Sequence, residues 1–209
     1  HFSGSEAPAA PANARQLTVF ESRIRPAFAA LGARFSLWNS SAHFLAGAKA
    51  YDLTRPGYAL YGGNPRPGEP NPMRPVVRLD AAIVQSRIVE PGARVGYNSR
   101  WLAKRKSRLA TLSLGYADGY PRNASGTDDA PGGEALVGGV PCPIVGTVSM
   151  DLIILDVTDA PESAVERGAP ATLIGGVLDL ERVGASGRTI GYEILTRLGA
   201  RYARRYRGG

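Results

Sequence analysis

Apolar residues near the start of the chain recur at helical spacing. Leu17, Phe20, Ile24, Phe28 and Leu31 lie three or four residues apart, which predicts an amphipathic helix. The segment that follows, ARFSLWNS at 33–40, is typical of a short strand, and Ser40 is positioned to cap a helix over SAHFLAGA at 41–48. AYDLTRPGYALYGG at 50–63 predicts a second strand that ends at RPG. This alternation of helix and strand is typical of parallel sheets and barrels.

The pattern changes after residue 75, where short runs rich in Val, Ile and Leu alternate with glycine and proline. Such runs predict strands bounded by turns. They are VVRLDAAIVQSRIVE at 76–90, RLATLSLGY at 108–116, EALVGGVPCPIVGT at 134–147, MDLIILDV at 150–157 and ATLIGG at 171–176. Near the end, Ile190, Ile194, Leu195, Leu198 and Tyr202 predict an amphipathic helix, with Thr189 as its candidate N-cap.

These two patterns of apolar residues predict two structural parts. A connector rich in proline and glycine joins them, GGNPRPGEPNPMRP at 62–75. We expect residues 1–66 to form β/α units and residues 76–209 to form a mostly β domain with a terminal helix. The boundary is expected within NPRPGEPNP at 64–72.

Composition narrows the class of protein only a little. The 44% of hydrophobic residues and 21% of charged residues are ordinary for a globular chain. No apolar run is long enough for a membrane span, so we expect no membrane association. The single cysteine, Cys142, cannot form an internal disulfide, which indicates a reducing, cytoplasmic setting; we interpret it as a small apolar filler rather than a reactive thiol.

The net charge of +7 raises the possibility of nucleic-acid binding. Its densest basic run is close to the C-terminus, where a continued helix would place most of these arginines on one face: Arg197, Arg201, Arg204, Arg205 and Arg207. No aromatic RNA-binding signature or zinc-finger spacing accompanies the run. We therefore interpret it as a solvated or subunit-facing surface, and we expect neither a nucleic-acid partner nor a metal site.

Several motifs have unusual composition and follow one another in a fixed order. They are NSSA at 39–42, RPGYALYG at 55–62, VGYNS at 95–99, LGYADGYPR at 114–122, VGTVSMD at 145–151 and GYEILTRLGARY at 191–202. In this order and rough spacing the chain resembles the alanine racemases, which depend on pyridoxal 5'-phosphate (PLP). The resemblance covers nearly the whole chain, including His1 and Phe2.

The resemblance implies the C-terminal units of a TIM-type (β/α)8 barrel followed by a mostly β C-terminal domain. It also implies a lysine that carries PLP, located near the start of the family sequence in a motif similar to VVKANAYGHG. None of Lys49, Lys104 and Lys106 lies in such a motif. We therefore expect a missing N-terminal barrel segment to supply the lysine, and we expect this chain to be inactive alone.

For the cofactor, the resemblance implies a phosphate site built from the Ser40 hydroxyl, the Gly57 and Tyr58 amides and the Tyr192 hydroxyl. Backbone amides at the start of a helix are suited to a phosphate dianion. Ser40 alone, without the other motifs, would be interpreted as a plain N-cap. Arg55 matches the arginine that the family points at the pyridine nitrogen, where a guanidinium can donate but cannot accept a proton. As a lone residue, Arg55 would be an ordinary surface arginine.

Racemisation needs one base on each face of the substrate α-carbon, and the family uses the lysine and a tyrosine that Tyr97 matches. A free tyrosine has a pKa of about 10, so a tyrosine base needs positive charge nearby. His1 matches a family histidine that hydrogen-bonds this tyrosine. Asn98 stands where the family usually has glycine, which leaves the local turn open. In isolation, Tyr97 would be a strand-end tyrosine packed on a sheet.

On the substrate side, Tyr116 resembles a residue that narrows the entrance. Met150 and Asp151 match a pair near the substrate carboxylate. Asp118 invites a catalytic interpretation, but an Asp before Gly in a tight loop usually bonds its own backbone, and we favour that structural role. Gly191 replaces the asparagine that usually precedes the helix tyrosine.

The implied function is interconversion of L-alanine and D-alanine, which supplies D-alanine for peptidoglycan. The implied assembly is a homodimer with shared active sites, in which Tyr97, Tyr116 and Asp151 serve the PLP of the other subunit. Two alternatives stay open: a broad-specificity amino-acid racemase of the same fold, and a non-catalytic basic β-domain binding module. The binding module would leave NSSA and RPGY without a role.

Overall fold

The structure is a computed structural model that describes residues 1–45, 47 and 49–208. The chain divides into two compact units, His1–Val76 and Val77–Gly209.

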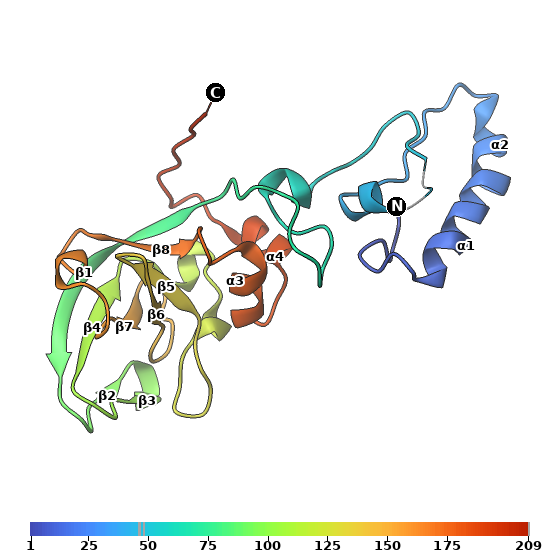
Figure 1. Cartoon of the computed structure of the whole chain (residues 1–209). Coiled ribbons are helices and arrows are strands. Elements are labelled where there is room, and N and C mark those ends of the chain that lie inside the picture. The colour runs from blue at the N-terminus through green and yellow to red at the C-terminus, as the bar shows by residue number, and fades with distance from the viewer. Residues whose placement is uncertain (46, 48, 209) are drawn as a thin grey trace. The chain divides into compact units, whose positions relative to one another are not determined.

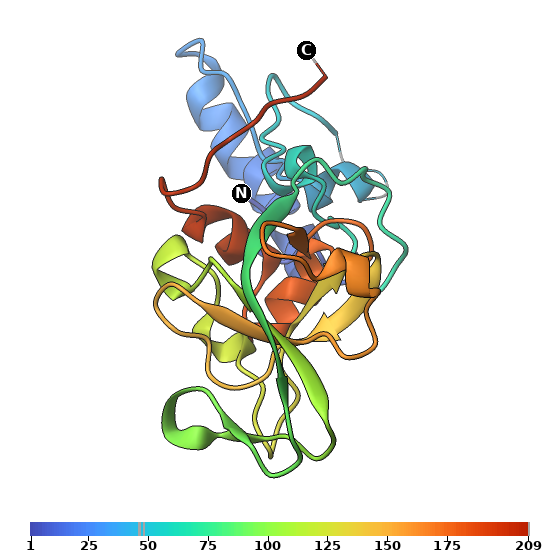
Figure 2. The same ribbon diagram turned by 90° about the vertical axis from the view of Figure 1, so that its left-hand side faces the viewer.

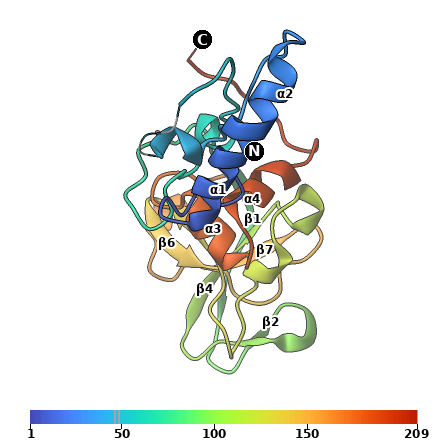
Figure 3. The same cartoon turned by 90° about the vertical axis from the view of Figure 1, so that its right-hand side faces the viewer.

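The N-terminal unit begins with one helical rod, drawn in blue in Figures 1 and 3. Three consecutive segments form it, namely α1 (Pro11–Val19), the π-helical η1 (Phe20–Ile24) and α2 (Arg25–Ala29). The predicted helix is therefore confirmed. Its π-helical turn precedes Pro26, and the amide of Arg25 bonds to the carbonyl of Phe20 five residues back. Proline has no N–H for the usual ladder, and such turns are a known adjustment next to it.

The rod covers the apolar core of this unit with only part of its apolar stripe. Leu17 and Phe20 pack against a cluster of Phe2, Leu37 and Ala42. The continuation of the stripe stays exposed, with exposed fractions of 40% for Ile24, 47% for Phe28 and 76% for Leu31.

The two strands predicted for this unit are not regular strands in the structure, and that prediction was wrong. The segments do run alongside each other, because Asp52 N donates to Phe35 O at 3.0 Å and Arg55 N donates to Trp38 O at 2.9 Å. Residues three apart point to opposite sides of an extended chain, so these two bonds cannot belong to one regular ladder. The Tyr51 hydroxyl donates to Glu21 Oε1 at 2.6 Å and fastens this pair to the rod.

Short 3-10 helices follow each extended segment, η2 (Ser41–Phe44) after the first and η3 (Tyr58–Tyr61) after the second. The predicted helix over 41–48 is thus shorter than expected, and its residues 46 and 48 lie outside the described residues. Ser40 occupies the N-cap position, but its side chain makes no capping bond. The cap is Asn39, whose Oδ1 accepts from Ala42 N at 3.0 Å.

The C-terminal unit is built on antiparallel strands, as the apolar runs predict (Figures 1 and 2). Its main sheet has the strand order β6-β5-β8-β1-β4-β7, and a small second sheet pairs β2 with β3. The bounds are β1 (Leu79–Val89), β2 (Arg94–Val95), β3 (Trp101–Leu102), β4 (Ser107–Leu112), β5 (Glu134–Val137), β6 (Val140–Pro143), β7 (Ile153–Asp156) and β8 (Pro170–Ile174). Short 3-10 turns connect them: η4 (Tyr97–Ser99), η5 (Tyr116–Asp118), η6 (Arg122–Ala124) and η7 (Glu162–Ala164).

The main sheet curls back on itself. The long strand β1 pairs with β8 through its first half and with β4 through its second, with a register shift between Ile83 and Gln85. Beyond the end of β6, Ile144 bridges to Leu155 of β7 on the other edge. This closure buries the inner faces of the strands, where Ile83, Leu155 and other aliphatic side chains are fully enclosed.

A two-residue turn divides EALVGGVPCPIVGT into the hairpin β5-β6. Gly138 and Gly139 occupy the turn with φ of 59° and 83°. Both central residues of this hairpin type need positive φ, which glycine adopts without steric cost.

Two helices complete the unit, α3 (Leu180–Ser186) and α4 (Gly191–Arg197). The helix α3 was not predicted from the sequence, although Asp179 caps it by accepting from Arg182 N at 2.8 Å, and Asp at that position is a recognised start signal. The predicted cap Thr189 of α4 was wrong by one residue, since Ile190 occupies that position.

The helix α4 ends at Arg197, so the predicted arginine-lined helix face was wrong. Leu198 leaves the helical conformation, and Gly199 N donates to Asp118 O at 3.2 Å. This bond directs the chain after α4 to the loop that contains LGYADGY at 114–120. The arginines beyond 197 therefore lie in a turn and in irregular chain rather than on a helical face.

Candidate functional site

Ser40 joins the two motifs that were predicted to hold a phosphate. It is 3% exposed, and its hydroxyl oxygen accepts a hydrogen bond from Ala59 N at 3.2 Å. Ala59 lies in η3 directly after Gly57 and Tyr58. The structure thus brings the NSSA and RPGY segments of the N-terminal unit together. The Ser40 hydroxyl hydrogen can be donated to an anion while its oxygen accepts from the backbone.

The Gly57 backbone faces open space on the side where a side chain would stand. Among the described residues, no atom outside Gly57 and its two chain neighbours lies within 4 Å of the position of an added Cβ. Tyr58 is buried. A phosphate can therefore approach the first turn of η3 at Gly57 without displacing another side chain.

Arg55 lies in a polar cluster with His1 in the same unit. Its Nη1 donates to the Ser36 hydroxyl, and its Nη2 lies 3.3 Å from His1 Nδ1. The other ring nitrogen of His1 lies 3.2 Å from Asn39 Nδ2. Sequence reasoning missed Ser36 and Asn39 as partners, although asparagine at the start of NSSA is a preferred helix cap.

In the C-terminal unit, Tyr97 projects from a tight turn and is 70% exposed. This exposure contradicts the alternative of a tyrosine packed on the sheet. The turn at Asn98, which the sequence left open, does form: Asn98 adopts the left-handed conformation with φ 61° and ψ 16°. Asparagine is among the residues other than glycine that enter this region most readily, so the turn persists without glycine.

The residues predicted for the substrate side occupy two adjoining loops of the same unit. Tyr116 lies in η5 and is 40% exposed, while Met150 is 54% exposed. Asp151 accepts from Arg201 Nη2 at 2.8 Å. Asp118 is buried, and its Oδ2 accepts from Gly115 N at 2.9 Å, which confirms the structural interpretation of this carboxylate.

Tyr192 lies in the first turn of α4 and is 37% exposed. Its predicted meeting with Ser40 at one phosphate involves both units and stays a prediction. The same holds for the predicted contact of His1 with Tyr97.

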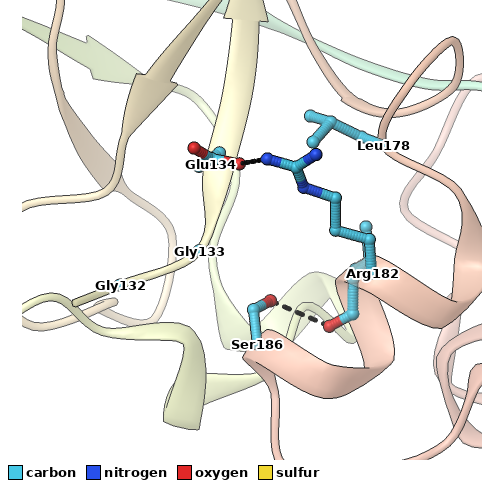
Figure 4. A pocket seen from close by; sticks show the side chains of 7 residues that line it. Gly132, Gly133, Glu134, Leu178, Arg182 and Ser186 are labelled. Carbon is cyan, nitrogen blue, oxygen red and sulfur yellow. Dashed lines mark hydrogen bonds and ion pairs between the residues drawn. The ribbon is translucent and has the colours of Figure 1, made fainter. Parts of the chain in front are cut away.

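A hollow of about 190 Å³ lies between the start of β5 and the helix α3 (Figure 4). Figure 4 shows that its polar groups are engaged with one another. Glu134 accepts from Arg182, and the Ser186 hydroxyl donates to Val183 O at 2.9 Å. None of the predicted site residues lines this hollow.

The chain thus combines a unit of helices and extended segments that carries candidate phosphate-binding groups with a mostly β unit that carries an exposed tyrosine. Comparison with known families agrees with this division. The family model for the alanine racemase C-terminal domain matches residues 76–206, and the model for the alanine racemase N-terminal domain matches residues 1–65. The chain belongs to the alanine racemase family.

Individual relatives give the same result. The chain is 59% identical over 206 residues to an alanine racemase of Methylobacterium sp. (strain 4-46), and 44% identical to a catabolic alanine racemase of Agrobacterium fabrum. These matches cover 99% of this chain in each case, and 54% and 51% of the relative. The chain therefore spans about half the length of the curated relatives that it matches.

Solved structures confirm the fold class. The alanine racemase of Bartonella henselae, which carries covalently bound pyridoxal phosphate, superposes with a TM-score of 0.85 at 39% identity and is covered to 55%. The enzyme of Streptomyces lavendulae gives a TM-score of 0.87 at 32% identity, with 55% covered. Both alignments include 99% or more of this chain. The chain is the C-terminal part of the TIM-type barrel followed by the β domain. Among the described residues, no helix has the length and apolar character needed to cross a membrane.

Proposed function

We propose that the protein containing this chain interconverts L-alanine and D-alanine with PLP, and so supplies D-alanine for peptidoglycan. Residues 1–66 are the last barrel units, and residues 76–209 are the C-terminal domain. The observation that carries the proposal is the hydrogen bond from the Ala59 amide to the Ser40 hydroxyl, which brings Ser40 next to the turn that contains the Gly57 and Tyr58 amides. The relatives named alanine racemase, at up to 59% identity, support the choice of reaction.

The residues of the N-terminal unit fit the cofactor. The Ser40 hydroxyl and the Gly57 and Tyr58 amides hold its phosphate, and the Tyr192 hydroxyl adds a further donor. Arg55 faces the pyridine nitrogen. Since a guanidinium has donors and no acceptor, Arg55 keeps a proton off this nitrogen. His1 helps to hold Arg55 in place, in line with the 3.3 Å separation of their nitrogens.

When bound, PLP weakens the bond between the α-carbon and its hydrogen by withdrawing electrons. Tyr97 is the base on one face of the α-carbon: its phenol oxygen takes the proton in one direction and returns it in the other. The second base is the lysine of the segment outside this chain. Tyr116 narrows the entrance, while Met150 and Asp151 line the side of the substrate carboxylate.

The active unit is a homodimer with shared sites, located in the cytoplasm. In this arrangement Tyr97, Tyr116 and Asp151 serve the PLP of the other subunit. The 70% exposure of Tyr97 supports this arrangement, because a base that is half of a shared site has to project from its own unit.

The test uses the full-length protein, purified with PLP and incubated with L-alanine, with D-alanine measured by chiral chromatography. Formation of D-alanine, with little turnover of L-serine or larger amino acids, is the expected result. Comparable turnover of larger amino acids would favour a broad-specificity racemase. A protein that binds PLP but forms no D-amino acid would contradict the proposal.

A further inference from the structure

Two loops of the C-terminal unit that carry substrate-side residues are bound to each other through their backbones. Tyr116 N donates to Ser149 O at 3.0 Å, and Ala117 N donates to Met150 O at 3.0 Å. Gly115 sits so close that an added Cβ would lie 2.3 Å from the Met150 carbonyl oxygen. A displacement of one loop is therefore passed directly to the other.

One arginine from a third segment connects these loops through their side chains. Arg201 Nε lies 3.2 Å from Asp118 Oδ1, and Arg201 Nη2 lies 2.8 Å from Asp151 Oδ1. The two carboxylates differ in environment: the Asp118 side chain is 10% exposed and the Asp151 side chain is 55% exposed. The other oxygen of Asp118 already holds the Gly115 amide. Arg201 thus links the exposed Asp151 to Asp118, whose carboxylate the Gly115 amide holds in place.

The segment that carries Arg201 is itself fastened to the first loop. Gly199 N donates to Asp118 O at 3.2 Å. Arg204, three residues further on, instead donates to the carbonyls of Leu198 and Gly199 in its own segment at 3.2 Å. Of these two arginines, only Arg201 contacts the loop carboxylates. Arg204 is therefore a matched control for Arg201.

We infer that Arg201 is a positioning residue of the racemase, acting through Asp151 and the Asp118 loop on substrate entry and selectivity. The inference rests on the proposed function. By holding both loops, Arg201 keeps Tyr116 and Met150 at a fixed spacing, which limits the size of the side chain admitted. By pairing with Asp151, it offsets a negative charge that would otherwise repel the carboxylate of an incoming amino acid.

The kinetic test compares Arg201→Ala with Arg204→Ala in the full-length holoenzyme. Arg201→Ala is expected to raise KM for L-alanine roughly five- to tenfold, with kcat changed less than about twofold, because the loss lies in binding. The preference for L-alanine over L-serine, as a ratio of kcat/KM values, should fall. Arg204→Ala removes an arginine from the same segment and should leave both quantities unchanged.

Adding Asp151→Asn to Arg201→Ala should lower KM again, because the unpaired carboxylate is removed. A merely structural role would not give this rescue. Arg201→Lys, which keeps one charge but only one point of contact, should lie between the parent and Arg201→Ala. If Arg201→Ala does not fold, Arg201→Lys carries the same test.

Hydrogen exchange gives a readout that is independent of turnover. Peptides covering 114–120 and 148–152 should exchange faster in Arg201→Ala and at the parent rate in Arg204→Ala. Unchanged KM and selectivity in Arg201→Ala would overturn the inference, whatever the exchange rates. A parent enzyme without alanine racemisation would overturn the proposed function instead, so the two failures are distinguishable.

Discussion

The hydroxyl oxygen of Ser40 accepts a hydrogen bond from the amide of Ala59 at 3.2 Å. These residues lie 19 positions apart in the sequence and follow two different extended segments. The bond therefore defines the place where the loops after both segments meet. Loops after the last two strands are a common location for phosphate in TIM barrels.

Replacing Ser40 by Ala should weaken PLP binding without abolishing it. A hydrogen bond to a charged group contributes about 1.5–3 kcal/mol, so Kd should rise roughly ten- to hundredfold. The measurement is a fluorescence titration of the full-length apoprotein with PLP. Ser41→Ala is the matched control, because the buried Ser41 hydroxyl has no hydrogen-bond partner among the described residues. Equal affinity in both variants would contradict the phosphate assignment.

Tyr97→Phe should collapse racemisation while PLP stays bound. The loss should exceed the typical 10²–10⁴-fold effect of a general base, because both directions of the reaction need this residue. Chiral analysis of product and the absorbance of bound PLP report the two properties separately. Tyr206→Phe, at a tyrosine that is 90% exposed, serves as the control. Parent-like turnover in Tyr97→Phe would rule out the two-base assignment.

Hybrid dimers test the sharing of active sites. One full-length subunit carries Tyr97→Phe, the other carries a replacement of the PLP lysine, and each variant alone should be inactive. If sites are shared, a mixed dimer contains one complete site, because the intact lysine of one subunit meets Tyr97 of the partner subunit. Activity should then appear on mixing and subunit exchange. If each site is built within one chain, no mixed dimer has a complete site and the mixture stays inactive.

The 209-residue chain alone should show neither racemase activity nor the absorbance of lysine-bound PLP, because none of its three lysines lies in the PLP motif. Its N-terminal unit should be ordered only with the rest of the barrel. The exposed apolar residues Ile24, Phe28 and Leu31 on the helical rod are the reason, since they need a covering partner. Hydrogen exchange of residues 1–62 should slow when a separate N-terminal half is added. Full protection in the chain alone would contradict this expectation.

Cys142 should resist alkylation in the folded protein at pH 8. It is 2% exposed, and burial raises the pKa of its thiol from about 9 to about 11. The reactive thiolate is therefore scarce until the pH approaches 11. The same shift means that the contribution of the neutral thiol to stability is present below pH 9 and lost between about pH 9 and 11. Peptide mapping after iodoacetamide treatment, with and without denaturant, checks the prediction; rapid labelling of the native protein would contradict it.

The strands of the C-terminal unit could be predicted from the sequence because their apolar runs are local signals. Val, Ile and Leu between glycine and proline mark β1, β4, β7 and β8 whatever their partners are. The helical rod at 11–29 was equally predictable from its periodicity. The family motifs, which are local as well, indicated the correct family.

Other features were decided only by contacts between residues distant in the sequence. Ser40 has the character of a helix cap, yet its hydroxyl accepts from Ala59, while Asn39 provides the cap. The C-terminal arginines have the spacing of a helix face, but the Gly199–Asp118 bond ends the helix early. In both cases the local conformational preference contributes about 1 kcal/mol or less to the free energy of folding. A tertiary contact at the same residues contributes more and decides the conformation.

The sequence by itself determined the family, the mostly β character of the C-terminal unit and the identity of the candidate site residues, because each depends on residue type and local spacing. The tertiary structure alone decided which of them are joined. It placed Ser40 against the Gly57–Ala59 turn, His1 beside Arg55, and Arg201 between Asp118 and Asp151. Hydrogen bonds and ion pairs act over about 3 Å, and no local pattern specifies which distant groups approach that closely.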